Sequence, residues 1–280
     1  MIARVWGCRG SLPTPGESTV RYGGNTTCVE IRCGRRVSVI LDAGTGIKRL
    51  GEELEPGAEI HVLLTHLHLD HLEGLRFFAP LWRAEGDVHI WGPSSPVHSL
   101  QERIARSFSP PLFPVNLGDI PATVVFHDVP DEPWELDGIR ILAQAVSHPG
   151  STVGFRLEHE ERTLAFIPDH EPVLGVELAA LDADWISGHA LADDVDVLLH
   201  DSQFTEDEYP ARVGWGHSSV AHAVGFARKA RAGRVVLFHH DPNRSDAQVD
   251  GLVERAAELW DGNGSHAPLA ACEGMTIDLR

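Results

Sequence analysis

The stretch Thr65-His66-Leu67-His68-Leu69-Asp70-His71 constrains this chain more than any other feature of its sequence. Four potential metal ligands fall within six residues, directly after the apolar run 60–64. An apolar run of that length followed by polar residues predicts a buried strand that ends in a loop. In α/β proteins, sites are built at that edge of a sheet. Imidazole and carboxylate groups together suit zinc, manganese or iron. We therefore interpret the stretch as part of a metal site rather than as a fortuitous polar loop.

The hydrophobic pattern predicts alternating groups of strands and helices along the whole chain. Strands are predicted at residues 2–6, 27–33, 37–42, 60–64, 87–91, 122–128, 134–136, 139–147, 152–158, 162–167, 195–200 and 234–238, with a hairpin turn at 34–36. Helices are predicted at 45–54, 73–82, 95–107 (with Ser94 or Ser95 as N-cap), 175–181, 218–231 and 245–260. Each half begins with strands and ends with β/α alternation. This order predicts an α/β (α+β) protein, a four-layer αββα sandwich formed by residues 1–280 as one domain.

Composition and charge limit the kinds of molecule that this protein can bind. The formal net charge is −18 and the chain has only two lysines, which argues against a long nucleic-acid ligand. Affinity for a phosphate backbone comes mainly from clustered Lys and Arg. No apolar run approaches membrane-spanning length, and residues 1–7 lack the features of a signal peptide. The four cysteines form no CxxC pair, so we expect reduced thiols in a cytoplasmic protein without a membrane partner.

Three further ligand-type side chains each follow a strongly apolar strand, and they are His148, Asp169 and His239. A catalytic first-row metal needs several protein ligands and an open position for water. The histidine stretch can begin two such sites, and the three later residues can complete them. A carboxylate can bridge two ions, which makes Asp169 the natural bridging group. The set predicts two divalent ions, Zn²⁺ or Mn²⁺ first, with iron as a further candidate.

This arrangement of residues resembles the metallo-β-lactamase superfamily, whose signature is an HxHxDH loop with His, Asp and His supplied later in the chain. The resemblance covers residues 2–245 and implies the αββα fold and a hydroxide that bridges two metals. It implies ligands of the first metal at His66, His68 and His148, ligands of the second at Asp70, His71 and His239, and a bridge at Asp169.

Two later segments narrow the resemblance to one branch of the superfamily. Residues 197–204 (VLLHDSQF) are similar to the HEATF segment of the phosphodiesterase branch, which includes ribonuclease Z and phosphoribosyl cyclic phosphodiesterases. Residues 216–219 (GHSS) are similar to that branch's GHST segment, whereas Asp201 stands where the family often has Glu. A carboxylate at 201 can orient His217 and keep it protonated. A protonated histidine beside a scissile phosphate donates to the leaving oxygen.

These residues lead to a predicted site and function. We expect Asp70, Asp201 and His217 to be catalytic. We expect Ser218 and Ser219 to bind phosphate, with Ser218 capping the following helix so that its N–H groups form an anion site. The competing interpretation is that His217 merely caps a helix and Asp201 is a strand-end acid. The roles of five other polar residues stay open, namely Asn25, Asp42 (a support beneath the histidine loop or a solvated residue), His240, Asp241 and Arg244.

The predicted activity is hydrolysis of a small phosphodiester, such as a cyclic nucleotide or a phosphoribosyl cyclic phosphate. Ribonuclease Z enzymes of the family carry an inserted arm that grips tRNA, but here only twenty residues separate His148 from Asp169. Three alternatives stay open: a hydrolase of a carboxylic ester, lactone or thioester, a ribonuclease Z-like nuclease, and a metal-bound ligand sensor. The resemblance also makes a homodimer plausible.

Overall fold

The computed structural model describes residues 1–33, 37–176, 178–260 and 266–279, so the predicted turn at 34–36 lies outside the described residues. Fourteen strands are described: β1 (Ile2–Gly7), β2 (Cys28–Arg32), β3 (Val37–Leu41), β4 (Glu59–Leu63), β5 (Asp87–Gly92), β6 (Thr123–Asp128), β7 (Trp134–Leu136), β8 (Ile139–Ala145), β9 (Val153–His159), β10 (Arg162–Ile167), β11 (Val197–Asp201), β12 (Val235–Phe238), β13 (Leu269–Ala270) and β14 (Thr276–Asp278). The α-helices are α1 (Ile47–Glu53), α2 (Leu69–Leu72), α3 (Leu100–Ala105), α4 (His189–Ala192), α5 (Val220–Lys229) and α6 (Asp246–Leu259). Short 3₁₀ helices are η1 (Glu17–Thr19), η2 (Glu73–Phe77), η3 (Ala79–Trp82), η4 (Leu117–Asp119), η5 (Leu178–Ala180), η6 (Ala183–Trp185) and η7 (Tyr209–Ala211).

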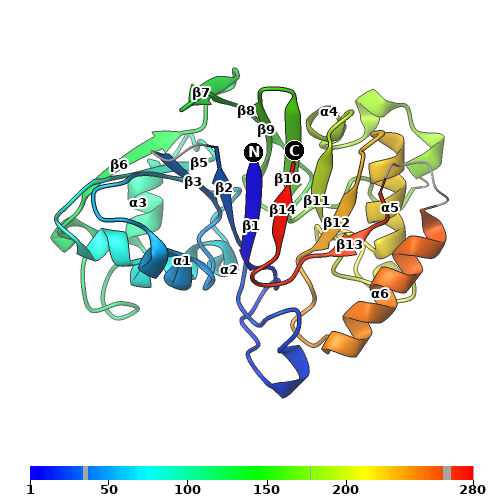
Figure 1. Ribbon diagram of the computed structural model, residues 1–280, viewed down its shortest axis with the longest axis horizontal. Coiled ribbons are helices and arrows are strands. Elements are labelled where there is room, and N and C mark those ends of the chain that lie inside the picture. The colour runs from blue at the N-terminus through cyan, green and yellow to red at the C-terminus, as the bar shows by residue number, and fades with distance from the viewer. Residues whose placement is uncertain (34–36, 177, 261–265, 280) are drawn as a thin grey trace.

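The strands form two mixed sheets of seven strands each. The first has the order β14-β1-β2-β3-β4-β5-β6, and the second has the order β13-β12-β11-β10-β9-β8-β7. In Figure 1, α1, α2 and α3 lie outside the first sheet, and α5 and α6 lie outside the second. The layers are therefore helix, sheet, sheet and helix, which confirms the predicted αββα class. None of the described helices has the length and apolar character needed to cross a membrane.

The strand β10 shows why a buried strand of this fold is a continuous run of apolar residues and not an alternation of apolar and polar residues. Leu164 and Phe166 belong to the core cluster between the sheets, whereas Ala165 and Ile167 belong to the cluster beneath the helices of the second sheet. All four side chains are fully buried. A strand covered on both faces needs apolar residues at every position.

The direction of the strands brings several strand ends to one edge of the sandwich. In the first sheet β3, β4 and β5 run parallel. In the second sheet β10, β11 and β12 run parallel, and β8 shares their direction because β9 is antiparallel to both β8 and β10. The residues that follow these strands therefore gather at the carboxyl edges of the sheets, where sites of open α/β sheets form.

Three predicted helices differ from the structure. The segment 73–82 forms η2 and η3 instead of one α-helix, because Pro80 cannot donate a backbone hydrogen bond within a continuous helix. The helix predicted at 175–181 is reduced, within the described residues, to η5. The helix predicted at 95–107 is α3, and its N-cap is Ser99 rather than Ser94 or Ser95. The Ser99 side chain and Glu102 form a capping box, which is a sequence signal for this start.

Replacing Phe166 with Ala should lower the free energy of unfolding by about 3–5 kcal/mol, because it leaves a cavity between the sheets. The ring of Phe166 is fully buried and contacts Phe238 edge-on, with ring centroids 5.6 Å apart. Urea denaturation measures the change. Phe77, with 59% of its surface exposed, is the control, and Phe77→Ala should cost less than about 1 kcal/mol. Equal losses in the two variants would contradict this account of the core.

Candidate two-metal site

The first cluster of candidate ligands joins both sheets. His66 and His68 follow β4 in the first sheet, and His148 follows β8 in the second. Their ligating nitrogens all lie within 4.8 Å of one another. His68 presents Nδ1, which is 3.2 Å from Nε2 of His148. The sequence-predicted trio of the first metal is thus brought together in space.

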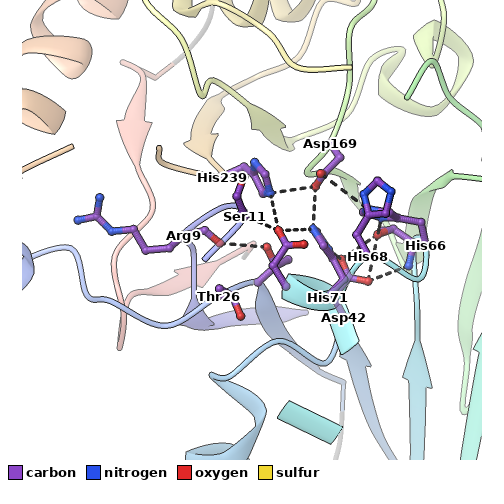
Figure 2. A network of polar contacts seen from close by, with 12 residues as sticks. Arg9, Ser11, Thr26, Asp42, His66, His68, His71, Asp169 and His239 are labelled. Carbon is purple, nitrogen blue, oxygen red and sulfur yellow. Dashed lines mark hydrogen bonds and ion pairs between the residues drawn. The ribbon is translucent and has the colours of Figure 1, made fainter. Parts of the chain in front are cut away.

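The second cluster lies next to the first and is buried throughout. Asp70 and His71 come from the first turn after the histidine loop, Asp169 follows β10 and His239 follows β12. Nε2 of His71 is 3.0 Å from Oδ1 of Asp169 (Figure 2). Nε2 of His239 is 3.2 Å from Oδ2 of Asp70. The sequence-predicted set of the second metal is also brought together.

The carboxylate of Asp169 lies between the two clusters. Its Oδ1 is 3.0 Å from Nε2 of His71 and 3.3 Å from Nε2 of His239. Its Oδ2 is 3.8 Å from Nε2 of His66 and 3.7 Å from Nε2 of His148. One oxygen therefore faces each cluster, as a carboxylate shared by two ions requires.

The donor atoms of both clusters fit divalent cations. Nε2 of His66, Nε2 of His71 and Oδ1 of Asp169 are buried and make no hydrogen bond, although the atoms of His71 and Asp169 lie 3.0 Å apart. Such groups are costly to leave unsatisfied in a protein interior, and a bound ion would satisfy them. Burial lowers the pKa of His66 well below its usual value and lowers the pKa of His148 as well, which favours the neutral imidazole that binds metals. The nitrogen and oxygen donors suit zinc, manganese or iron.

Asp42 supports the histidine loop from beneath. Its carboxylate accepts hydrogen bonds from the backbone N–H and the hydroxyl of Thr65, at 2.7 and 2.9 Å. Its Oδ2 also lies 2.8 Å from Nδ1 of His71, and the Thr65 hydroxyl lies 3.0 Å from Nδ1 of His66. Contacts of this kind fix the ring orientation of a metal ligand. Asp42 is fully buried and has a left-handed backbone with φ of 60°, so the fold holds it in this place against local strain.

Three residues without a predicted role hold three further candidate ligands. The carbonyl of Gly216 is 2.8 Å from Nδ1 of His148, and Oε1 of Gln203 is 3.1 Å from Nδ1 of His239. The backbone N–H of Ser11 donates to Oδ2 of Asp70 at 2.7 Å. The carbonyl of Gly216 and the N–H of Ser11 leave no signal in the side-chain pattern, whereas Gln203 acts through its side-chain oxygen.

His217 and Asp201 form a close pair beside the bridging carboxylate. Nδ1 of His217 is 2.6 Å from Oδ2 of Asp201 and 4.0 Å from Oδ2 of Asp169. The shorter acid at 201 therefore reaches the imidazole. Burial alone would lower the pKa of His217, but the carboxylates of Asp201 and Asp169 outweigh it and raise the pKa to about 9. Asp201 is itself fixed by the backbone N–H groups of Gln203 and Ser218.

Ser218 and Ser219 are placed differently from the prediction. The N-cap of α5 is Ser219, whose hydroxyl accepts from the N–H of His222, and not Ser218. The hydroxyl of Ser218 donates to the carbonyl of His170, and its N–H is used by Asp201. Both serines are buried and their hydroxyls make hydrogen bonds within the fold, and phosphate binding by Ser218 and Ser219 stays a prediction. Sequence alone could not decide which serine ends the loop, because both are good capping residues.

The other polar residues near His239 are structural neighbours of the site. Nε2 of His240 lies 2.9 Å from the carbonyl of Ala271, and the Asp241 carboxylate accepts from the N–H of Asn243. Arg244 donates to the carbonyl of Gln203, the residue that orients His239. Asn25 donates from its backbone N–H and from its side-chain amide to the carboxylate of Glu273.

Comparison with known families places this fold. The family model described as "Beta-lactamase superfamily domain" matches residues 37–240, which is more than half of the chain. The protein therefore belongs to the beta-lactamase superfamily and is a metal-dependent hydrolase of the metallo-β-lactamase fold.

Individual relatives are distant but cover most of the chain. A ribonuclease Z of Haloarcula marismortui is 24% identical over 266 residues, which cover 80% of this chain and 83% of the relative. The metallo-beta-lactamase fold protein YhfI of Bacillus subtilis has a TM-score of 0.71 at 19% identity and covers 99% of both chains. The short form of human tRNase Z also has a TM-score of 0.71, at 20% identity, with complete coverage of both chains. These structures show the shared fold.

Replacing Gly10 with Ala should weaken the second metal cluster. A Cβ at residue 10 would lie 2.3 Å from the ring of His239, so this imidazole must shift from its present position beside Asp70. We expect the variant to retain less metal per chain, as measured by inductively coupled plasma mass spectrometry after dialysis. Gly16 lies in the same loop with nothing within 4 Å of its added Cβ, so Gly16→Ala is the control and should retain the wild-type content. Full metal content in both variants would contradict the assignment of His239.

Replacing Asp42 with Asn should weaken metal binding without removing a candidate ligand. The amide cannot accept from Thr65 and His71 as the carboxylate does, so both His66 and His71 lose their fixed orientation. We expect the affinity to fall about 10–100-fold, which competition with a chromophoric chelator measures. Asp119, an exposed residue whose carboxylate accepts from Asn116, provides the control substitution Asp119→Asn. An unchanged affinity in the Asp42 variant would show that this residue serves only the fold.

Proposed function

We propose that this protein is a phosphodiesterase that uses two divalent ions, Zn²⁺ or Mn²⁺ first, to hydrolyse a small phosphodiester. The observation that carries the proposal is the His217–Asp201 pair, at 2.6 Å, beside the carboxylate of Asp169. His66, His68 and His148 would hold one ion, Asp70, His71 and His239 the other, and Asp169 both. When bound, such ions supply activation of a water for attack and withdrawal of negative charge from the phosphoryl oxygens.

Residues of the chain supply the proton that the leaving group needs. Asp201 holds Nδ1 of His217, which leaves Nε2 of the same ring for the substrate. A water loses a proton to the solvent as its oxygen forms the new bond to phosphorus, and the bond to the leaving oxygen breaks. Nε2–H of His217 donates its proton to that leaving oxygen, and Asp201 stabilises the protonated ring beforehand. Asp70 would help to hold the second ion, and it contacts His71 and His239.

A small diester fits this chain better than tRNA. The segment between His148 and Asp169 is fully described and forms the hairpin of β9 and β10. The net charge of −18 opposes a long polyanion. A cyclic nucleotide or a phosphoribosyl cyclic phosphate matches a site with one general acid and two ions.

A ribonuclease Z-like activity is the second candidate, and one observation favours it. The relatives named ribonuclease Z align over most of this chain. Processing of a precursor tRNA under conditions where small diesters are not turned over would support this candidate over the small-diester proposal.

A substrate panel tests the proposal directly. The metal-loaded protein is assayed with bis(p-nitrophenyl) phosphate, 2′,3′- and 3′,5′-cyclic nucleotides, a precursor tRNA and a set of lactones. We expect turnover of the small diesters. Lactone turnover without phosphodiester turnover would overturn the proposal in favour of an ester hydrolase, and absence of any turnover would favour a ligand sensor.

Replacing His217 with Ala should slow the reaction most where the leaving group needs a proton. For a 2′,3′-cyclic nucleotide, whose leaving group is an alkoxide, we expect kcat to fall about 10²–10⁴-fold. For bis(p-nitrophenyl) phosphate, whose leaving group is a stable phenolate, the fall should be much smaller. Steady-state kinetics on the two substrates measure the difference, with His266→Ala as a control at an exposed histidine. Equal losses on both substrates would remove the acid role of His217.

A further inference from the structure

A cleft of about 530 Å³ opens beside the first cluster of histidines. His66 and His68 form part of its wall, so a group bound beside these two side chains would extend into it. The volume lies in the range of sites that hold small organic ligands. The cleft crosses the junction of the two sheets, because the hydroxyl of Ser151, which follows His148, donates to the carbonyl of Ser94, which follows β5.

The wall of this cleft combines apolar and polar groups. Leu69 and Leu112 are large apolar side chains of the wall, and they are 65% and 69% exposed. Ser94, Ser95 and Ser151 contribute polar groups to the same cleft. Such a mixture suits a sugar with an attached planar ring, because the ring can cover exposed leucine surface while the sugar contacts hydroxyl groups.

Two arginines line the cleft, and they differ in their partners. The guanidinium of Arg103 donates to the carbonyl of Pro93 at 2.6 Å and lies 3.8 Å from Asp128. Arg106 is exposed at the end of α3, and within the described residues its guanidinium makes no hydrogen bond or ion pair. Glu102, one turn earlier on α3, is close enough to feel the charge of Arg106 but does not form an ion pair with it. In a chain with 41 acidic and 23 basic residues, an arginine that lines a cleft without an ion pair can bind an anion from outside.

We infer that Arg106 recognises a second anionic group of the substrate, so that the diester is a nucleotide carrying an additional phosphate. This inference rests on the proposed function, because it takes the scissile phosphate to lie at the two clusters. Arg106 is then a residue that determines specificity: it takes no part in bond breaking, and it favours a doubly anionic ligand over a cyclic nucleotide with a single phosphate. The planar guanidinium can donate two parallel hydrogen bonds to a phosphate.

The competing interpretation is that Arg106 is a solvated cation at the end of a helix, where positive charge is favourable. That interpretation predicts no preference for an additional phosphate. The two accounts therefore differ in a binding measurement that needs no turnover.

Calorimetric titration of the metal-loaded protein with thymidine 5′-monophosphate and thymidine 3′,5′-bisphosphate distinguishes the two interpretations of Arg106. We expect the wild type to bind the bisphosphate at least about tenfold more tightly, as hydrogen bonds between charged groups contribute. Arg106→Gln should remove this preference and Arg106→Lys should keep part of it. Arg49→Gln removes an exposed arginine of α1 that does not line the cleft, and it should keep the full preference.

A wild type without the preference, or an Arg106→Gln variant that retains it, would overturn the inference and leave Arg106 as a solvated cation. Failure of the proposed function gives a different result. In that case bis(p-nitrophenyl) phosphate is not hydrolysed by any variant, whichever nucleotide binds. A protein that hydrolyses this diester yet binds both nucleotides equally loses only the inference about Arg106.

Discussion

The carboxylate of Asp169 is the group on which the rest of the site depends. Its two oxygens face two different clusters, at 3.0 Å from His71 and 3.7 Å from His148. It follows β10, which lies in the middle of the second sheet, whereas the histidine loop follows β4 of the first sheet. A carboxylate from one sheet can reach imidazoles from the other only because the apolar core between the sheets fixes their separation. The fold is therefore a rigid frame that holds the donor atoms close together. Holding them there removes water from these polar groups, which is unfavourable.

A shell of hydrogen bonds turns this frame into an oriented site. Asp42, Gln203 and the carbonyl of Gly216 each hold the far nitrogen of a candidate ligand. Arg244 in turn holds Gln203 through its backbone carbonyl. Asp42 and His239 follow β3 and β12 with left-handed backbones, φ of 60° and 58°, which a non-glycine residue rarely adopts. The backbone strain turns each side chain away from its strand direction and toward the clusters, and the surrounding hydrogen bonds and packing hold it there.

Residues at the ends of apolar strands were predictable, and residues that act through their backbone were not. His148, Asp169 and His239 could be found because each is a ligand-type side chain directly after a buried strand, and the structure brings all three together with the histidine loop. Ser11 and Gly216 contribute an N–H and a carbonyl, which every residue possesses, so no pattern marks them. The error at Ser218 has the same origin. Two adjacent serines can both cap α5, and the choice between them depends on which hydroxyl meets the N–H of His222 and which meets the carbonyl of His170.

The sequence by itself determined the class of fold and the identity of the candidate ligands. Buried strands must be apolar over their whole length, and polar ligands can stand only at their ends. Both features can therefore be recognised from the order of residues along the chain. The tertiary structure alone decided which oxygen of Asp169 faces which cluster, how Asp201 reaches His217, and that Arg106 lines the same cleft as His66 and His68. These are distances between residues far apart in the chain. They are set by the packing of two sheets, which no local pattern encodes.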